Sequence, residues 1–113
     1  MRAMRWGVVA VLLLGLCAAP AAADEPEVLL GVSMDFGKGQ ITLDVASSGC
    51  TKKEDFRLEF AGNVLTVIRK ERDACKAVPR RVGFTFQLKG VGINPHTPFR
   101  ISNAFIANEL LAK

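Results

Sequence analysis

Few residues in this chain of 113 amino acids could carry acid–base or nucleophilic chemistry. There is one histidine, His96, and there is no tyrosine. In a Ser–His–Asp arrangement the nucleophile would be Ser47 or Ser48. Asp44 or Asp73 would then have to orient the imidazole ring. No G-x-S-x-G sequence surrounds either serine, so the pattern of a nucleophile elbow is missing. The sequence therefore predicts no catalytic residues and a protein that is not an enzyme.

Metal, phosphate and cofactor sites have equally little support in the sequence. A zinc site needs three or four protein ligands, and one histidine with two cysteines that we expect to be bridged does not supply them. Gly37–Gly39 could cradle a phosphate, but no helical pattern follows it, so we interpret it as a turn. The neighbouring acids Glu54 and Asp55 follow two lysines, and such groups form weak surface ion pairs. We predict no metal and no cofactor.

Two of the three cysteines, Cys50 and Cys75, lie beyond the N-terminal segment. In a small exported domain such a pair most often forms a disulfide, and no C-x-x-C motif or Cys/His cluster offers another use. Closing a loop of about 26 residues stabilises a fold by about 3.5 kcal/mol in the chain-entropy treatment. That contribution is large for a domain whose core is small. We predict a Cys50–Cys75 disulfide.

The connection that carries Cys75 is strongly basic. Between Arg69 and Arg81, six bases stand against two acids. The predicted disulfide would bring two further lysines near them. Such a patch attracts phosphates or an acidic partner, and the alternative is a solvated loop that keeps a strand edge from aggregating. The candidate binding residues in this patch are Lys52, Lys53, Arg69, Lys70, Arg72, Lys76, Arg80 and Arg81.

A second candidate surface is the loop 90–100, which contains two glycines and two prolines. Pro95 and Pro98 stiffen it on either side of His96, because proline fixes its own backbone angle. Rigid loops at the end of a sandwich often carry recognition, and they equally often only connect strands. A stiff loop would suit an inhibitor that inserts it into an enzyme, since preorganisation lowers the entropy lost on binding.

The first 23 residues have the three parts of a secretory signal peptide. Arg2 and Arg5 give a positive start, and Gly7–Leu16 is an uncharged apolar run of ten residues. Ala21–Ala23 supplies small residues before a cleavage point. The run is short for a membrane span, which needs about 20 residues, although an uncleaved anchor is the alternative. We predict cleavage, leaving one periplasmic or secreted domain at 24–113 with no transmembrane segment.

Charge is distributed unevenly along the predicted mature chain. Its 13 Lys and Arg residues and 11 Asp and Glu residues give a net charge of +2. Residues 24–51 carry one lysine and five acids, whereas residues 52–100 carry eleven bases and five acids. This polarity bears on partners and not on the fold.

Apolar residues alternate with polar ones in several short segments, which is typical of half-buried β-strands. Turn residues such as Gly62 and Asn63 separate them. The C-terminal piece fits either a strand that extends to about Ile106 or a helix, and we favour the strand with a frayed or briefly helical tail. The predicted strands cover 28–34, 40–46, 56–60, 64–68, 82–88 and 99–102.

Six to seven short strands spaced about ten residues apart predict an all-β fold. We expect a small antiparallel sandwich of the immunoglobulin-like kind, or a partly open barrel, with one disulfide. The tryptophan that immunoglobulin domains bury between their cysteines is missing, because Trp6 belongs to the signal segment. The sequence does not favour a βαβ arrangement, since no long amphipathic helical segment separates the strands.

These features favour a non-enzymatic exported binding or accessory domain. Its partner would be an anionic envelope component or an acidic protein, bound through the basic connection. The alternative is a small disulfide-stabilised inhibitor of an exported enzyme that acts through the loop 90–100. Nucleic acid is not an expected partner, because no aromatic residues are interleaved with the bases.

The mature protein is expected to begin at Asp24. The small residues Ala21–Ala23 stand where a signal peptidase requires them. Intact mass measurement of the exported protein tests this prediction. Retention of Met1, or a lipid on Cys17, would contradict it.

Overall fold

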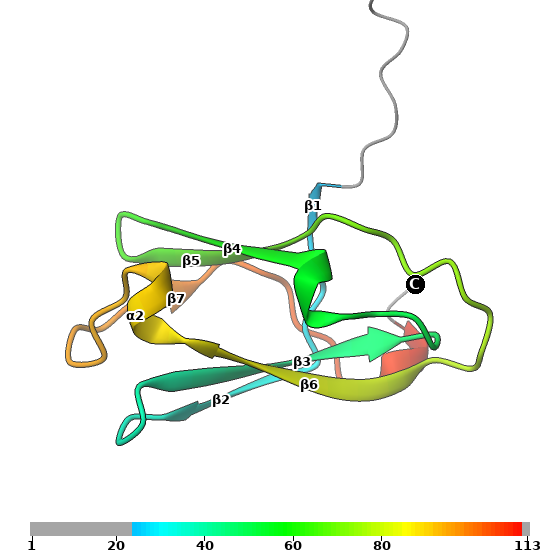
Figure 1. Ribbon diagram of the computed structural model, residues 1–113, viewed down its shortest axis with the longest axis horizontal. Coiled ribbons are helices and arrows are strands. Elements are labelled where there is room, and N and C mark those ends of the chain that lie inside the picture. The colour runs from blue at the N-terminus through cyan, green and yellow to red at the C-terminus, as the bar shows by residue number, and fades with distance from the viewer. Residues whose placement is uncertain (1–23, 112–113) are drawn as a thin grey trace, which may run out of the picture.

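Seven strands form two separate sheets in the computed structural model, which describes residues 24–111 (Figure 1). The two sheets confirm the predicted all-β sandwich, and they do not close into a barrel. The predicted signal segment 1–23 lies outside the described residues. Within 24–111, no helix has the length and apolar character needed to cross a membrane. One sheet holds β1 (Glu25–Pro26), β4 (Phe56–Ala61), β5 (Val64–Arg69) and β7 (Arg100–Ile101), and the other holds β2 (Gly31–Asp35), β3 (Gln40–Ser47) and β6 (Arg80–Gln87).

Strand β3 is the centre of its sheet and shows the predicted alternation over its whole length. It pairs antiparallel with β2 on one side and with β6 on the other. Ile41, Leu43 and Val45 are at most 1% exposed, while the residues between them are half-buried. The period-2 pattern therefore reports a strand with one face in the core.

Two tight turns join neighbouring strands as the sequence predicts. Gly62 and Asn63 both have positive φ, 59° and 62°, which is the geometry of a type I′ turn between β4 and β5. In the turn between β2 and β3 the Asp35 carboxylate accepts the backbone N–H of Lys38 at 3.0 Å. These local contacts set the register of both hairpins.

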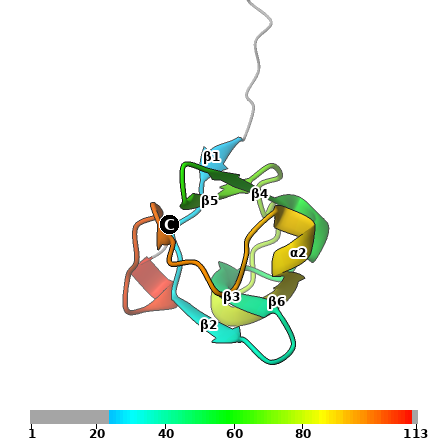
Figure 2. The ribbon, with the colours of Figure 1, turned by 90° about the vertical axis from the view of Figure 1, so that its left-hand side faces the viewer.

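The core lies between the two sheets, which form two layers in the view along the strands (Figure 2). One expectation about its edge is wrong: β6 ends at Gln87, and Leu88 begins the short helix α2 (Leu88–Val91). The helical turn lets the carbonyl of Leu88 accept the N–H of Ile93 at 3.0 Å. The helical turn buries both side chains, which are 0% and 3% exposed.

The C-terminal chain differs more from its prediction. Strand β7 ends at Ile101, an isolated bridge joins Leu29 to Phe105, and the described part of the chain ends in the 3₁₀ helix η3 (Glu109–Leu111). The prediction of a strand to about Ile106 is therefore wrong. Figure 2 shows this orange-to-red chain passing along one side of the sandwich. The physical reason is that β1 and β7 both pair with β5, at different positions along it. The part of β5 between these two positions needs hydrogen-bond partners of another kind.

A buried side chain supplies those bonds. The Nδ2 group of Asn103 donates to the carbonyls of Glu27 at 2.7 Å and Val67 at 2.9 Å. Its Oδ1 atom accepts the backbone N–H of Val67 at 2.8 Å. Asn103 is 6% exposed, so its amide replaces a short piece of strand along β5 in a place that water does not reach.

Replacing Asn103 by Ala is expected to lower the free energy of unfolding by about 2–3 kcal/mol, because the buried N–H of Val67 loses the acceptor that Asn103 supplies and the carbonyls of Glu27 and Val67 each lose a donor. Asn103→Asp should cost at least as much, since a carboxylate cannot donate to the two carbonyls. Urea unfolding of the oxidised protein measures both effects. Ser33→Ala, at an exposed position of β2, is the matched control, and an Asn103→Ala loss as small as that of the control would contradict this role.

Candidate functional site

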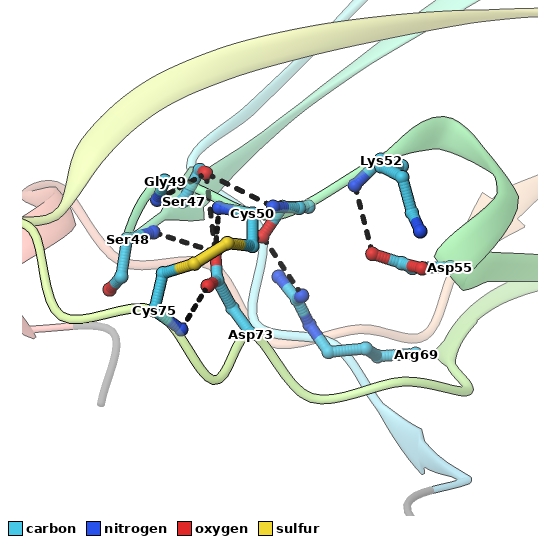
Figure 3. Close-up of a disulfide and its surroundings, with 10 residues drawn as sticks. Ser47, Ser48, Gly49, Cys50, Lys52, Asp55, Arg69, Asp73 and Cys75 are labelled. Carbon is cyan, nitrogen blue, oxygen red and sulfur yellow. Dashed lines mark hydrogen bonds between the residues drawn. A yellow bond between two sulfur atoms is a disulfide. The ribbon is translucent and has the colours of Figure 1, made fainter.

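The predicted disulfide is present and joins two loops at one end of the sandwich (Figures 1 and 3). Cys50 follows β3, and Cys75 lies in the connection between β5 and β6, with Cα atoms 5.7 Å apart. We call residues 70–79 the basic connection. Backbone bonds hold it alongside the loop after β3, from the N–H of Lys70 to the carbonyl of Asp55 at 2.7 Å and from the N–H of Ala77 to that of Ser48 at 3.0 Å.

The Asp73 carboxylate binds to both sides of this disulfide (Figure 3). Its Oδ2 atom accepts the backbone N–H groups of Ser48 at 2.8 Å and Cys50 at 3.2 Å, and the hydroxyl of Thr51 at 2.6 Å. Its Oδ1 atom accepts the N–H of Cys75 at 3.0 Å. One side chain therefore fixes the backbone of both cysteines. Sequence reasoning missed this role, although an aspartate two residues before a loop cysteine is a typical Asx-turn signal.

These bonds change the acidity of Asp73. Partial desolvation raises the pKa of the carboxyl group, but the bonds from the Thr51 hydroxyl and from the backbone of Cys75, Ser48 and Cys50 lower it by more. The net result is a pKa far below the usual range of an aspartate. Asp73 is consequently a structural anion and is not available as a general acid or base near neutral pH.

Arg69 belongs to the same polar network. Its guanidinium forms a bidentate ion pair with Glu27, at 2.7 Å and 3.1 Å, and the two side chains are only 12% and 15% exposed. It also donates to the Thr51 hydroxyl and to the carbonyl of Ala46, both at 3.2 Å. The Phe56 ring lies 4.8 Å below its charge. The structure therefore places Arg69, a predicted binding residue, where its charge is used within the fold.

Arg81 is also occupied. Its Nη1 atom lies 3.0 Å from Asp44 on the outer face of the β2–β3–β6 sheet. Gly83 leaves room beside this pair, because a Cβ there would lie 2.9 Å from the Asp44 carboxylate and would displace that side chain. The pair is partly exposed, so it contributes little stability, but it reduces the free charge at this position.

The remaining predicted bases are exposed and, within residues 24–111, none of them forms an ion pair. Four lie on or directly after the basic connection, and two lie in the loop that follows Cys50. One of the latter, Lys53, places its ammonium 5.0 Å from the centre of the Phe86 ring. Among the described residues, six of the eight predicted bases thus form no ion pair: Lys52, Lys53, Lys70, Arg72, Lys76 and Arg80.

A polar groove of about 620 Å³ runs beside the basic connection. Arg69 and Arg72 line it, but so do four acids, and the groove itself therefore carries net negative charge. An anion would be repelled from it. The exposed bases that do not line the groove form the surface that could attract one. The four acids are Glu25, Glu27, Asp73 and Glu109.

His96 lies in another region, in the loop that follows α2 at the opposite end of the sandwich (Figure 1). Its backbone N–H donates to the Oδ1 atom of Asn94 at 2.8 Å, and its side chain is exposed. The loop forms one wall of an apolar groove of about 590 Å³, whose other lining includes Phe36 and Phe105, 61% and 49% exposed. The structure therefore does not bring His96 together with the bases.

Comparison with protein-family models, with curated proteins and with solved structures finds no match to this chain.

Reducing the Cys50–Cys75 bridge is expected to lower the thermal midpoint by more than about 10 °C. The loop that it closes is worth about 3.5 kcal/mol, and one kcal/mol shifts the midpoint of a domain of this size by roughly 4–8 °C. Thermal unfolding with and without a reductant measures the shift. Two free thiols in non-reducing alkylation of the purified protein would contradict the bridge itself.

Asp73→Asn is expected to remove part of the acid sensitivity of the fold. A carboxyl group whose pKa is lowered by folding stabilises the native state above its unfolded pKa near 3.8, and this stabilisation is lost as the pH falls below that value. The variant should unfold more easily at pH 7, by about 1–2 kcal/mol, and should lose less stability between pH 5 and pH 2. Urea unfolding across this pH range tests both. An unchanged pH slope would show that Asp73 is not the titrating group.

Proposed function

We propose that this protein is an exported, non-enzymatic binding domain whose basic connection recognises an anionic component of the cell envelope. The observation that carries the proposal is the group of exposed, unpaired bases around the disulfide. Lys70, Lys76 and Arg80 supply three positive charges within eleven residues, and none of them lines the acidic groove. Glu71 and Asp73 are the acids among them, and Asp73 is enclosed by its hydrogen bonds.

Preorganisation supports a binding role for this surface. The disulfide, the Asp73 carboxylate and two backbone bonds hold a connection that has no regular secondary structure. A charged loop that only kept the protein dispersed would not need to be fixed in this way. A fixed loop loses less entropy when it binds, so its charges contribute more to affinity.

The export proposal rests on two features of the chain. Residues 1–23 have the pattern of a signal peptide, and Cys50 and Cys75 are bridged, as is usual for small proteins of oxidising compartments. We therefore place the mature protein in the periplasm or outside the cell. The absence of a catalytic arrangement in the sequence supports a binding role over an enzymatic one.

The shape of the charged surface favours an extended anionic ligand. The neighbouring groove is acidic, so a small anion would not be enclosed there. The free bases are instead spread over the outside of the connection and the loop after Cys50. Such an arrangement suits repeated phosphate or carboxylate groups on a surface, such as lipid headgroups or an acidic glycan.

The alternative function, inhibition of an exported enzyme through the loop 90–100, has less support. Asn94 and the two prolines stiffen this loop, as an inhibitor would need. However, Pro95 and Pro98 line the apolar groove together with Phe36. Surface that lines a groove is suited to receiving a partner, whereas an inhibitory loop must project into one.

The double variant Lys70→Ser/Arg80→Ser tests the proposal, because both bases are exposed and neither lines the acidic groove. Each base near an anionic surface contributes about 1 kcal/mol, so binding to vesicles with anionic headgroups should weaken roughly 30-fold, with a shallower salt dependence. The matched control is Lys38→Ser/Lys89→Ser, which removes the same charge from exposed positions away from the basic connection. Vesicle co-sedimentation across a range of salt concentrations measures both.

Equal weakening by the two double variants would mean that vesicle binding depends only on the net charge of the protein, and it would contradict the proposal. Parallel assays with anionic vesicles and with an acidic polysaccharide distinguish the two envelope sources. Binding to an acidic protein alone would overturn the envelope assignment.

A further inference from the structure

We propose that, when the Cys50–Cys75 disulfide is reduced, the two thiolates and the Asp73 carboxylate form a binding site for a divalent metal ion such as Zn²⁺. This inference is independent of anion binding by the basic connection. It concerns the reduced state of the end of the molecule that carries Cys50 and Cys75.

The first argument is that Asp73 holds the two cysteines together without help from the sulfur–sulfur bond. Its carboxylate accepts the backbone N–H of Cys50 at 3.2 Å and that of Cys75 at 3.0 Å, and the N–H of Ser48 at 2.8 Å. None of these bonds involves a sulfur atom. Breaking the disulfide therefore leaves both cysteine backbones attached to one carboxylate, and the thiols remain neighbours.

The second argument is the position of the ligand atoms. The two Sγ atoms and a carboxylate oxygen of Asp73 all lie within 4.8 Å of one another, and this is the cluster of potential ligands found among the described residues. Zinc–sulfur bonds of about 2.3 Å in a tetrahedral site place sulfur atoms about 3.8 Å apart. The bonded sulfur atoms must therefore move apart after reduction, and the Cα distance of 5.7 Å between Cys50 and Cys75 leaves room for their side chains to reach one metal ion.

The third argument is that Asp73 has an oxygen to offer. Oδ2 accepts most of the hydrogen bonds, whereas the N–H of Cys75 is the single donor to Oδ1 among the described residues. A carboxylate oxygen has two lone-pair sites, so Oδ1 retains one. The metal could bind there while the bonds of Oδ2 keep the loop after β3 in place.

Charge and access also fit. Two thiolates and a carboxylate would carry three negative charges, which a divalent cation and the neighbouring Lys76 together balance. Cys50 is exposed and Cys75 is half-buried, so a reductant and a metal ion can both reach the bridge. Water would complete the fourth coordination position.

The chemistry is a two-electron exchange followed by metal binding. A dithiol reductant transfers two electrons and two protons to the Cys50–Cys75 bond, which breaks to give two thiols while the dithiol becomes a disulfide. The metal ion then displaces the two thiol protons and forms two metal–sulfur bonds. The sequence-based expectation of no metal site counted both cysteines as bridged, and it therefore describes the oxidised protein alone.

The test is an anaerobic titration of the reduced mature protein with Co²⁺, followed by displacement with Zn²⁺. We expect thiolate-to-cobalt absorption that saturates at one metal ion per chain. The oxidised protein, and the variant Cys50→Ser/Cys75→Ser, should bind at least 100-fold more weakly. Asp73→Asn should bind at least tenfold more weakly than the reduced wild type.

A folding measurement covers the case in which reduction unfolds the protein. Zn²⁺ that binds the native state should raise the thermal midpoint of the reduced protein, or restore its fold, and it should leave Cys50→Ser/Cys75→Ser unchanged. The proposal is overturned if no thiolate absorption develops or if saturation occurs at one metal ion per two chains. It is also overturned if Asp73→Asn binds as tightly as wild type or if Zn²⁺ neither stabilises nor refolds the reduced chain.

Discussion

One carboxylate, that of Asp73, organises the polar end of this molecule. It is bonded to the backbone of the loop after β3 and to the backbone of Cys75, and the Thr51 hydroxyl links it to Arg69. Arg69 in turn pairs with Glu27 and donates to the carbonyl of Ala46 in β3. This polar network therefore connects strands of both sheets, in addition to the apolar core between them. A half-buried ion pair of this kind is costly to disrupt on one side only, because the remaining charge loses its partner.

The same network divides the charges of the protein into two groups. Arg69, Arg81 and Asp73 are used within the fold, so they add little to the field outside it. Six of the described bases that form no ion pair lie on the connection between β5 and β6, directly after it, or on the loop after Cys50. The binding proposal and the metal proposal both follow from this arrangement. The Asp73 carboxylate fixes the backbone of the two loops. In the binding proposal these loops hold exposed cations in place for a ligand, and in the metal proposal they hold two sulfur atoms in place for one.

Local patterns predict the strands well, and they predict the site in part. Three features can be recognised in the sequence itself: the alternation in Gln40–Ser47, the Gly62–Asn63 turn and the cysteine pair. The failures involve residues whose partners are distant in the chain. Asn103 bonds to the carbonyl of Glu27, 76 residues away, and Arg69 pairs with that residue's carboxylate across 42 residues. No periodicity shows which arginine in a basic run will be half-buried, because that depends on which acid the neighbouring strand β1 brings beside it.

Backbone amide hydrogen exchange at the Cys50–Cys75 end tests the central claim most directly. If Asp73 fixes the two loops, the amides of Ser48, Cys50 and Cys75 in the oxidised wild type should exchange slowly, although they lie outside the strands. In Asp73→Asn these three amides should lose their protection while those of β3 and β5 keep theirs. Rapid exchange of the three amides in the wild type, or equal protection in the two proteins, would contradict the account.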